Sequence, residues 1–280
     1  MCAYLSNGPG KDLLTYLLKS TPAADAQTKL SSVLAGFPGL SGQWMRLEAV
    51  VSPKRMRSAV AVTVGNRYSG SSQADCHLSA QQLNDALKGR GLRVEAPWID
   101  QPGGAPMVDR LKQVLASEVL PFDDGFVFCF CGHGDATELS GNDNARTSYQ
   151  DIINAIATEP KLQGKPKLIV FDCCQGNAAS DPGHLRVPKD TVLAFATALS
   201  TGAFAWRGVG NVYSNRLAAA IRSYAATDSV EDLLKRTQGE VHGERLVTKD
   251  QHGVEMRHRQ IAHVDSALGA YHLFLGRPAP

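Results

Sequence analysis

Two short segments, residues 126–131 and 168–171, consist of apolar side chains, and polar residues and glycine follow each of them directly. A run of four to eight apolar residues without a polar face is typical of a strand buried on both sides of a parallel sheet. Helices must then cover both faces of that sheet. The two segments therefore predict an α/β fold with a mainly parallel sheet.

The rest of the chain alternates in the same way between strands and helices. Further strands are expected at residues 58–64, 92–97, 192–197 and 272–275. Helical spacing of apolar residues is found at residues 79–87, 107–119, 147–157, 214–225 and 229–241, with Ser79 as a suitable N-cap for the first helix. This order predicts a three-layer sandwich, in which helices flank a six-stranded, mainly parallel sheet.

Residues 1–54 differ from the remainder of the chain. Two short amphipathic segments, residues 12–18 and 27–34, are separated and followed by proline and glycine. The apolar residues are too few to form a core of their own. We expect an N-terminal extension over residues 1–54 and one domain over residues 55–280.

Composition excludes several classes of protein. Hydrophobic residues make up 43% of the 280 residues and charged residues 20%, as in globular proteins. The net charge of +2 is too small to indicate nucleic-acid binding. No apolar run reaches the roughly 18 residues of a membrane span, and the first residues lack the pattern of a secretory signal. We expect a cytoplasmic protein with no nucleic-acid or membrane partner.

Chemically reactive residues follow both apolar strands. Gly132-His133-Gly134 follows the first strand and Asp172-Cys173-Cys174-Gln175-Gly176 the second. Sites in open α/β sheets form at the carboxyl ends of strands, so neighbouring strands would bring an imidazole and a thiol to one edge. A histidine base and a cysteine nucleophile need this arrangement. The adjacent glycines leave backbone N–H groups accessible as an oxyanion hole.

The cysteines also allow other interpretations. The chain has six, including an adjacent pair and a Cys-x-Cys, which make a poor disulfide framework. Most isolated cysteines are inert core residues. Cys129, Cys131 and His133 alternate along one strand and could bind zinc together with Cys174. Structural zinc sites usually use loop knuckles instead, so we predict no metal site.

The motif around Cys174 resembles that of the caspase family. The family signature is Q-A-C-[RQG]-G, with the histidine about 50 residues upstream. Residues 172–176 match it at Cys174, Gln175 and Gly176 and differ at the first two positions. His133 lies 41 residues upstream of Cys174, and Gly132-His133-Gly134 is similar to the family's histidine motif.

The resemblance extends along the chain, over roughly residues 55–278. Residues 196–207 resemble the caspase segment that ends in Ser-Trp-Arg, and residues 260–274 resemble the C-terminal strand region. The family includes the related metacaspases and paracaspases. The resemblance implies a caspase-like fold and a cysteine endopeptidase, with a role in regulated cell death.

The resemblance also implies a role for each site residue, position by position. It implies Cys174 as the nucleophile, His133 as the general base, and the backbone N–H groups of Gly134 and Cys174 as the oxyanion hole. Cys173 should point the other way along the pleat and have a structural role. The family implies protein or peptide substrates and no cofactor. Activation by calcium and homodimer formation through the last strand vary within the family.

The specificity pocket combines features of two groups of relatives. Caspases that cleave after aspartate use two arginines and a glutamine two residues before the nucleophile. Arg207 matches the second arginine, but Asp172 occupies the glutamine position, as in metacaspases and paracaspases that cleave after Arg or Lys. Cys76 stands where metacaspases often have cysteine, and Trp206 belongs to the segment that binds substrate. The first caspase arginine and the second metacaspase acid, near Gln73 and at Ser79, are unmatched.

Two interpretations of this pocket remain open. In the favoured one, Asp172 is open to substrate and pairs with Arg or Lys at P1, the residue before the cut. In the other, Asp172 pairs with Arg207, because buried charges need partners, and the pocket is neutralised or reshaped. Arg67 would replace the first caspase arginine only after a loop shift. The alternatives to a basic P1 are an Asp-specific caspase and a catalytically silent regulator or scaffold.

Overall fold

The computed structural model describes residues 53–68, 75–175, 185–198, 202–206, 208–244, 246–249, 255–268 and 272–276. The helices expected at residues 12–18 and 27–34 lie outside the described residues, as does almost all of the expected extension. Arg207 and Gln73 lie outside them as well.

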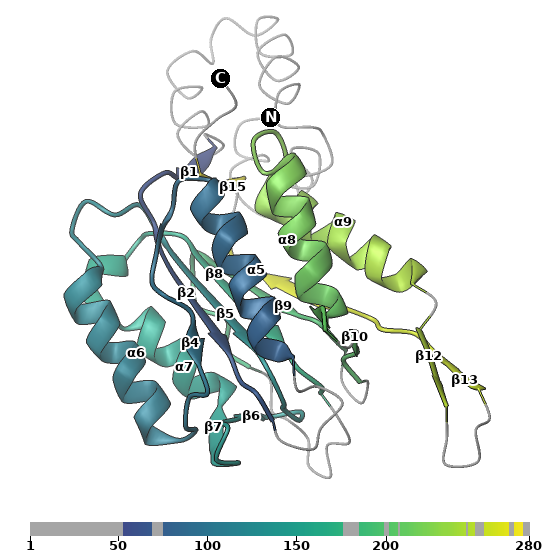
Figure 1. Cartoon of the computed structure of the whole chain (residues 1–280). Coiled ribbons are helices and arrows are strands. Elements are labelled where there is room, and N and C mark those ends of the chain that lie inside the picture. Colours follow the sequence, from purple (N-terminus) through teal and green to yellow (C-terminus); the bar gives the residue numbers. More distant parts are fainter. Residues whose placement is uncertain are drawn as a thin grey trace, which may run out of the picture.

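A mixed sheet forms the centre of the fold (Figure 1). Its strand order is β14-β9-β8-β5-β2-β3. The short β4 also pairs with β2, at the carboxyl end of β2. The pairs are parallel except for β14, which runs antiparallel to β9. The strands are β2 (Val60–Gly65), β3 (Arg93–Val94), β4 (Trp98–Ile99), β5 (Phe126–Cys131), β8 (Lys167–Asp172), β9 (Thr191–Phe195) and β14 (His263–Ser266).

Helices cover both faces of this sheet, which confirms the predicted three-layer α/β fold. Helices α5 (Cys76–Gly89), α8 (Val212–Tyr224) and α9 (Val230–Gly243) lie on one face (Figure 1). Helices α6 (Ala105–Glu118) and α7 (Tyr149–Ala157) lie on the other, and a 3-10 turn, η2 (Pro160–Leu162), follows α7. No described helix has the length and apolar character needed to cross a membrane.

The strand pleat explains why both faces are apolar. In β5 the three phenylalanines at residues 126, 128 and 130 pack towards α6 and α7, whereas Val127, Cys129 and Cys131 pack towards α5, α8 and α9. The same alternation holds in β8 and β9. Burying a large apolar side chain contributes about 1.5–3 kcal/mol, so a shift in register by one residue would disrupt two cores at once.

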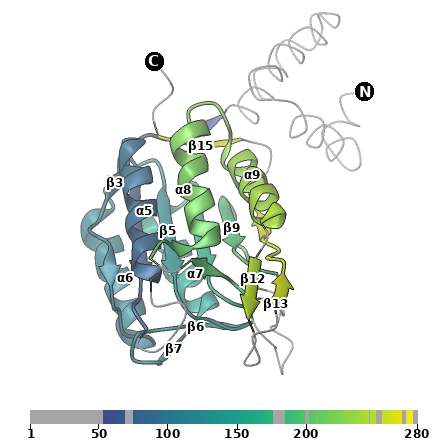
Figure 2. The ribbon, with the colours of Figure 1, turned by 45° about the vertical axis from the view of Figure 1, so that its right-hand side comes forward.

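Within the described residues, four two-stranded sheets lie around this body (Figure 2). The strand predicted at residues 272–275 exists, but it pairs with a strand at residues 54–56 instead of joining the central sheet. The central sheet has seven described strands, where six were expected. Its edge strand β14 lies within residues 260–274, which resemble the family's C-terminal strand region. The small pairs are β1 (Lys54–Met56) with β15 (Leu273–Leu275), β6 (Glu138–Ser140) with β7 (Arg146–Ser148), β10 (Ala205–Trp206) with β11 (Gly210–Asn211), and β12 (Leu246–Lys249) with β13 (Glu255–His258).

The expected N-cap of α5 is wrong. The helix begins at Cys76, after Asp75, and Ser79 lies one turn inside it. Ser79 is fully buried, and its hydroxyl accepts the backbone N–H of Asn211 at 2.6 Å. Its role is therefore a tertiary contact with the start of α8.

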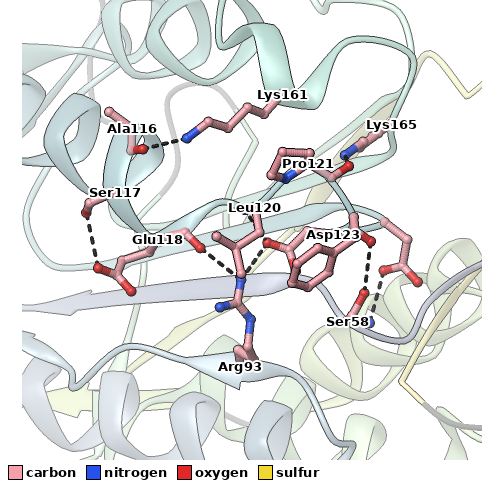
Figure 3. Close-up of polar contacts among 12 residues, drawn as sticks. Ser58, Arg93, Ala116, Ser117, Glu118, Leu120, Pro121, Asp123, Lys161 and Lys165 are labelled. Atoms are coloured by element: carbon pink, nitrogen blue, oxygen red, sulfur yellow. Dashed lines mark hydrogen bonds and ion pairs between the residues drawn. The ribbon is translucent and has the colours of Figure 1, made fainter.

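A network of hydrogen bonds fixes the loop before β5 (Figure 3). This loop lies at the amino-terminal end of β5, whereas the candidate site lies past its carboxyl end. Arg93 donates to the Glu118 carbonyl at 2.8 Å and pairs with the buried Asp123 at 2.5 Å. Lys161 and Lys165 donate to the carbonyls of Ala116 and Pro121. These contacts hold the start of β5 and so help to set its register against β8.

Candidate active site

The ends of β5 and β8 bring the predicted histidine and cysteine to one edge. Cys131 pairs with Asp172 in the parallel ladder, and the Gly132 N–H donates to the Asp172 carbonyl at 3.1 Å. His133 and Cys174 each lie two residues past that pair. Both side chains are partly exposed. Parallel pairing therefore gives the imidazole and the thiol equivalent positions on neighbouring strands.

Tyr68 holds the histidine from the end of β2. Its ring lies against the His133 ring with centroids 4.1 Å apart and the planes tilted by 50°. Its hydroxyl accepts the backbone N–H of His133 at 3.1 Å and donates to the Ser140 carbonyl at 2.8 Å. Asn66 donates to the same hydroxyl at 3.2 Å. Tyr68 is only 6% exposed, so this side chain gives the histidine loop a fixed position.

In the turn after His133, the backbone N–H of Gly134 takes no part in the hydrogen bonds of the bridge that it forms. Gly134 faces Leu139 in an antiparallel bridge. The two hydrogen bonds of this bridge run from Ser140 to the His133 carbonyl and from Asp135 to the Glu138 carbonyl, both at 2.9 Å. Neither uses the Gly134 N–H, which suits a group expected in an oxyanion hole.

Only glycine fits at position 134. A Cβ atom there would lie 2.8 Å from both the Cys173 Sγ and the Tyr149 hydroxyl, and 3.0 Å from the Glu138 carbonyl. A larger residue would push the turn away from β8. The glycine beside the histidine is thus required by close packing.

Burial and a nearby positive charge both favour the neutral form of His133. Burial, and then the positive charge of Arg146, lower the pKa of His133 below its ordinary value. Arg146 itself pairs with Asp135 at 3.1 Å, within the same histidine loop. A lowered pKa keeps the imidazole unprotonated at neutral pH, as a general base requires.

Cys174 differs from the other described cysteines in its exposure. Cys76, Cys129, Cys131 and Cys173 are buried, whereas Cys174 is partly exposed. Burial raises the pKa of Cys129 to about 12, and it also raises the pKa of the other three buried thiols. Those four thiols stay protonated and unreactive. Among the described cysteines, Cys174 alone has a partly exposed thiol, as a nucleophile requires.

Cys173 points to the opposite side of the sheet, as the pleat predicts. It packs in the core beneath α6 and α7, and its Sγ lies 3.1 Å from the Tyr149 hydroxyl. Its contacts are consistent with a structural role.

Asp172 is fully buried against the start of α8, so in this structure its carboxylate is not open to substrate, contrary to the favoured interpretation of the pocket. Its Oδ2 accepts the Ser214 N–H at 2.9 Å and the Ser214 hydroxyl at 2.5 Å. Burial raises the pKa of Asp172 to about 6, although these hydrogen bonds oppose the shift. The helix N-terminus favours a carboxylate at this position. The Asp172 carboxyl is therefore mainly ionised at neutral pH.

Cys76 lies on the same side of the sheet as Asp172. Its thiol is buried, and the Asp172 charge is the second cause, after burial, of its raised pKa. Ser79 lies one turn further along α5 and contacts Asn211. The two pocket residues predicted from the sequence, Cys76 and Asp172, are thus brought together, and α8 adds Asn211 and Ser214 to them.

The segment at residues 202–206 passes beside Cys174. The Ala203 N–H donates to the Cys174 Sγ at 3.3 Å. Gln260 accepts the Phe204 N–H at 3.2 Å, and the His258 ring lies 5.0 Å from the Phe204 ring. Trp206 follows in β10, half-buried. The structure therefore brings the segment of Trp206 next to the cysteine.

Arg67 is engaged elsewhere. It forms an ion pair with Asp100 at 3.0 Å, and its backbone N–H donates to the same carboxylate at 2.7 Å. These contacts tie it to the loop after β4. Arg67 therefore does not replace the first caspase arginine in this structure.

The zinc alternative finds no support among the described residues. They contain no group of three or more His, Cys, Asp or Glu side chains that could hold a metal ion. Cys129 and Cys131 lie in the core beneath α5 and α8, and the Cys131 Sγ contacts the Ser214 hydroxyl at 3.2 Å.

The sequence did not predict Tyr68, Asn211 or Ser214 as site residues. Tyr68 follows the end of β2, so the rule that sites lie at strand ends could have indicated it. Asn211 and Ser214 follow a Gly-Val-Gly turn and gave no chemical signal of their own. They join the site because α8 begins directly beside Asp172.

The comparison with protein families agrees with the fold. The family model described as the caspase domain matches residues 58–269. No curated protein matches the chain at a significant level. The match spans most of the chain, so the protein belongs to the caspase domain family of cysteine peptidases.

Proposed function

We propose that this protein is a cysteine endopeptidase that uses His133 and Cys174 as its catalytic pair and cleaves after Arg or Lys. The observation that carries the proposal is the register of β5 and β8, in which both residues lie two positions past the Cys131–Asp172 pair. The partly exposed thiol and the neutral imidazole support it further.

The proposed reaction uses these groups in turn. His133 accepts the Cys174 thiol proton, and the thiolate attacks the scissile carbonyl carbon. The N–H groups of Gly134 and Cys174 stabilise the oxyanion. The imidazolium then protonates the leaving amine, and an acyl-thioester on Cys174 remains. His133 next removes a proton from water, which attacks the thioester and releases the new carboxyl terminus and the free thiol.

The preference for a basic P1 residue rests on Asp172. A buried carboxylate attracts a guanidinium or ammonium group and repels an acidic side chain. Ser214 donates two hydrogen bonds to one carboxylate oxygen, which stabilises the charged form. Arg67, the candidate replacement for an aspartate-binding arginine, is paired with Asp100.

The test is cleavage of a fluorogenic peptide library that varies at P1, with and without calcium. The wild type should cut after Arg and Lys, and Cys174→Ala should abolish the activity. Cys129→Ala, which removes a buried thiol from the same sheet, is the matched control and should remain active. Cleavage after Asp would refute the pocket assignment. No cleavage under any condition would favour a catalytically silent regulator.

We further propose a role in regulated cell death and a homodimer, both expected from the family. A second copy would extend the central sheet at its edge strand β14, which pairs on one side with β9. Sedimentation analysis over a range of concentrations tests this. A monomer at all concentrations, with full activity, would contradict the homodimer.

A further inference from the structure

The first turn of α8 has an unusual cap. Asn211 occupies the N-cap position, but its side chain makes no capping hydrogen bond. An N-cap asparagine normally uses its side-chain oxygen for this purpose. Here the Asp172 carboxylate accepts the Ser214 N–H instead, at 2.9 Å. The Asn211 Oδ1 therefore does not cap the helix, although an asparagine oxygen at this position usually does.

The rest of Asn211 is tightly fixed. Its backbone N–H donates to the Ser79 hydroxyl at 2.6 Å, and its Nδ2 donates to the Asp172 carbonyl at 3.1 Å. Gly210, with φ +105°, allows this close approach, because a Cβ atom there would collide with the Ser79 Oγ. The side chain is fully buried, so its direction is set by both hydrogen bonds.

Two buried oxygen atoms in this region lack a hydrogen-bond donor among the described residues. They are the Oδ1 of Asn211 and the Oδ1 of Asp172. A buried polar atom without a partner costs about 1–3 kcal/mol, so such atoms in a folded protein need an explanation. Both are acceptors, and both are closed to solvent in this structure, so the missing donor would have to be carried in by a ligand that opens the pocket.

A guanidinium group fits this requirement better than an ammonium group. Arginine presents five N–H donors in a planar fork, whereas lysine presents a compact, strongly hydrated charge. Two acceptor oxygens from neighbouring side chains, only one of them charged, suit donors that are spread over a plane. An acidic or apolar P1 side chain would leave both oxygens without a donor.

We propose that Asn211 is a specificity-determining residue, whose Oδ1 acts together with the Asp172 Oδ1 to bind P1 arginine in preference to lysine. The inference rests on the proposed endopeptidase function. Asn211 contacts Ser79, which stands at the position of the second metacaspase acid, so the amide at the start of α8 takes over part of the role of that missing carboxylate.

The test compares kcat/KM for matched peptides with Arg or Lys at P1. The wild type should prefer Arg by roughly tenfold, the effect of one hydrogen bond to a charged group. Asn211→Ser keeps a good N-cap residue but removes Oδ1, and it should abolish most of that preference. Asn211→Asp should increase the kcat/KM for Lys. Asn154→Ser, an exposed asparagine on α7, is the matched control and should leave the ratio unchanged.

A binding measurement separates this inference from the proposed function. In a Cys174→Ala background, fluorescence anisotropy gives the affinity of labelled peptides with Arg or Lys at P1, and Asn211→Ser should reduce the Arg preference there too. Active enzyme with an Arg to Lys ratio that Asn211→Ser does not change would overturn the inference alone. An inactive wild type whose binding still depends on Asn211 would overturn the endopeptidase alone.

Discussion

Tyr68 contacts His133 in two ways, through ring packing at 4.1 Å and through the hydrogen bond from the His133 N–H at 3.1 Å. Tyr68→Phe keeps the ring and removes the acceptor, which leaves a backbone N–H without its partner. We expect kcat to fall about tenfold with little change in KM. Steady-state kinetics with a P1 arginine peptide measures both constants.

A purely structural role for Tyr68 would give a different result. In that case Tyr68→Phe would lower the melting temperature and leave kcat unchanged well below it. Tyr224→Phe, on the exposed side of α8, is the matched control and should affect neither constant.

Arg146 affects the titration of His133. Its positive charge helps to lower the pKa of His133, after burial. Arg146→Gln removes this charge, so the imidazole should be protonated at a higher pH and the acid limb of kcat should move to higher pH. The measurement is the pH dependence of kcat at saturating substrate, where the protonation of unliganded Asp172 does not enter. An acid limb that stays in place, or moves to lower pH, would contradict this assignment.

At the scale of elements, α8 depends on a carboxylate that is costly to bury. Burial raises the pKa of Asp172 from 3.8 to about 6. The folded state therefore binds a proton that the unfolded state has already lost between these pH values. The stability contributed by the protonated group is fully present below about pH 4 and is lost as the pH rises through 6.

This linkage is measurable with Asp172→Asn, which cannot titrate. Between pH 4 and pH 7.5 the unfolding free energy of the wild type should fall by about 2 kcal/mol relative to the variant. Urea unfolding of both proteins at the two pH values gives the difference, in which other titrating groups cancel. A difference that stays constant with pH would mean that Asp172 is not desolvated.

The segment at residues 202–206 relies on one buried side chain. Gln260 accepts the Phe204 N–H and donates to the Ala196 carbonyl at 2.9 Å, so it ties the segment to the end of β9. Gln260→Leu removes both bonds. Because the segment passes beside Cys174, we expect a KM several-fold higher for peptide substrates and faster hydrogen exchange over residues 202–206. Unchanged exchange there would contradict the anchoring role. Gln113→Leu, at an exposed position of α6, is the matched control.

At the scale of the whole molecule, the sequence predicted the part of the fold that is buried on both faces. The apolar segments at residues 126–131 and 168–171 lie side by side in the centre of the sheet, as expected. The edge strand β14 was indicated only as part of residues 260–274, because its His-Val-Asp-Ser side chains are partly or fully exposed and form no apolar run. The apolar residues 273–275 form the last strand, as expected, but this strand pairs with β1 and not with the central sheet.

Some residues of the candidate site could likewise be predicted from the sequence, and others could not. Asp172 ends β8, and His133 and Cys174 each lie two residues past the Cys131–Asp172 pair, so the strand-end rule could predict that all three lie at the same ends of neighbouring strands. Tyr68 and Asn211 depend on contacts between distant parts of the chain; the bond from Asn211 to Ser79 spans 132 residues. No local pattern encodes such an approach. The sequence thus indicated the proposed reacting groups but not the side chains that contact them.

Covalent labelling with a peptidyl-arginine chloromethyl ketone tests the central claim most directly. The reagent carries a basic P1 group to the nucleophile and alkylates it, and peptide mapping by mass spectrometry identifies the modified residue. The account predicts one label, on Cys174, that is lost in His133→Ala and outcompeted by a P1 arginine peptide but not by a P1 aspartate peptide. Labelling of another cysteine, or faster labelling by the P1 aspartate reagent, would contradict it.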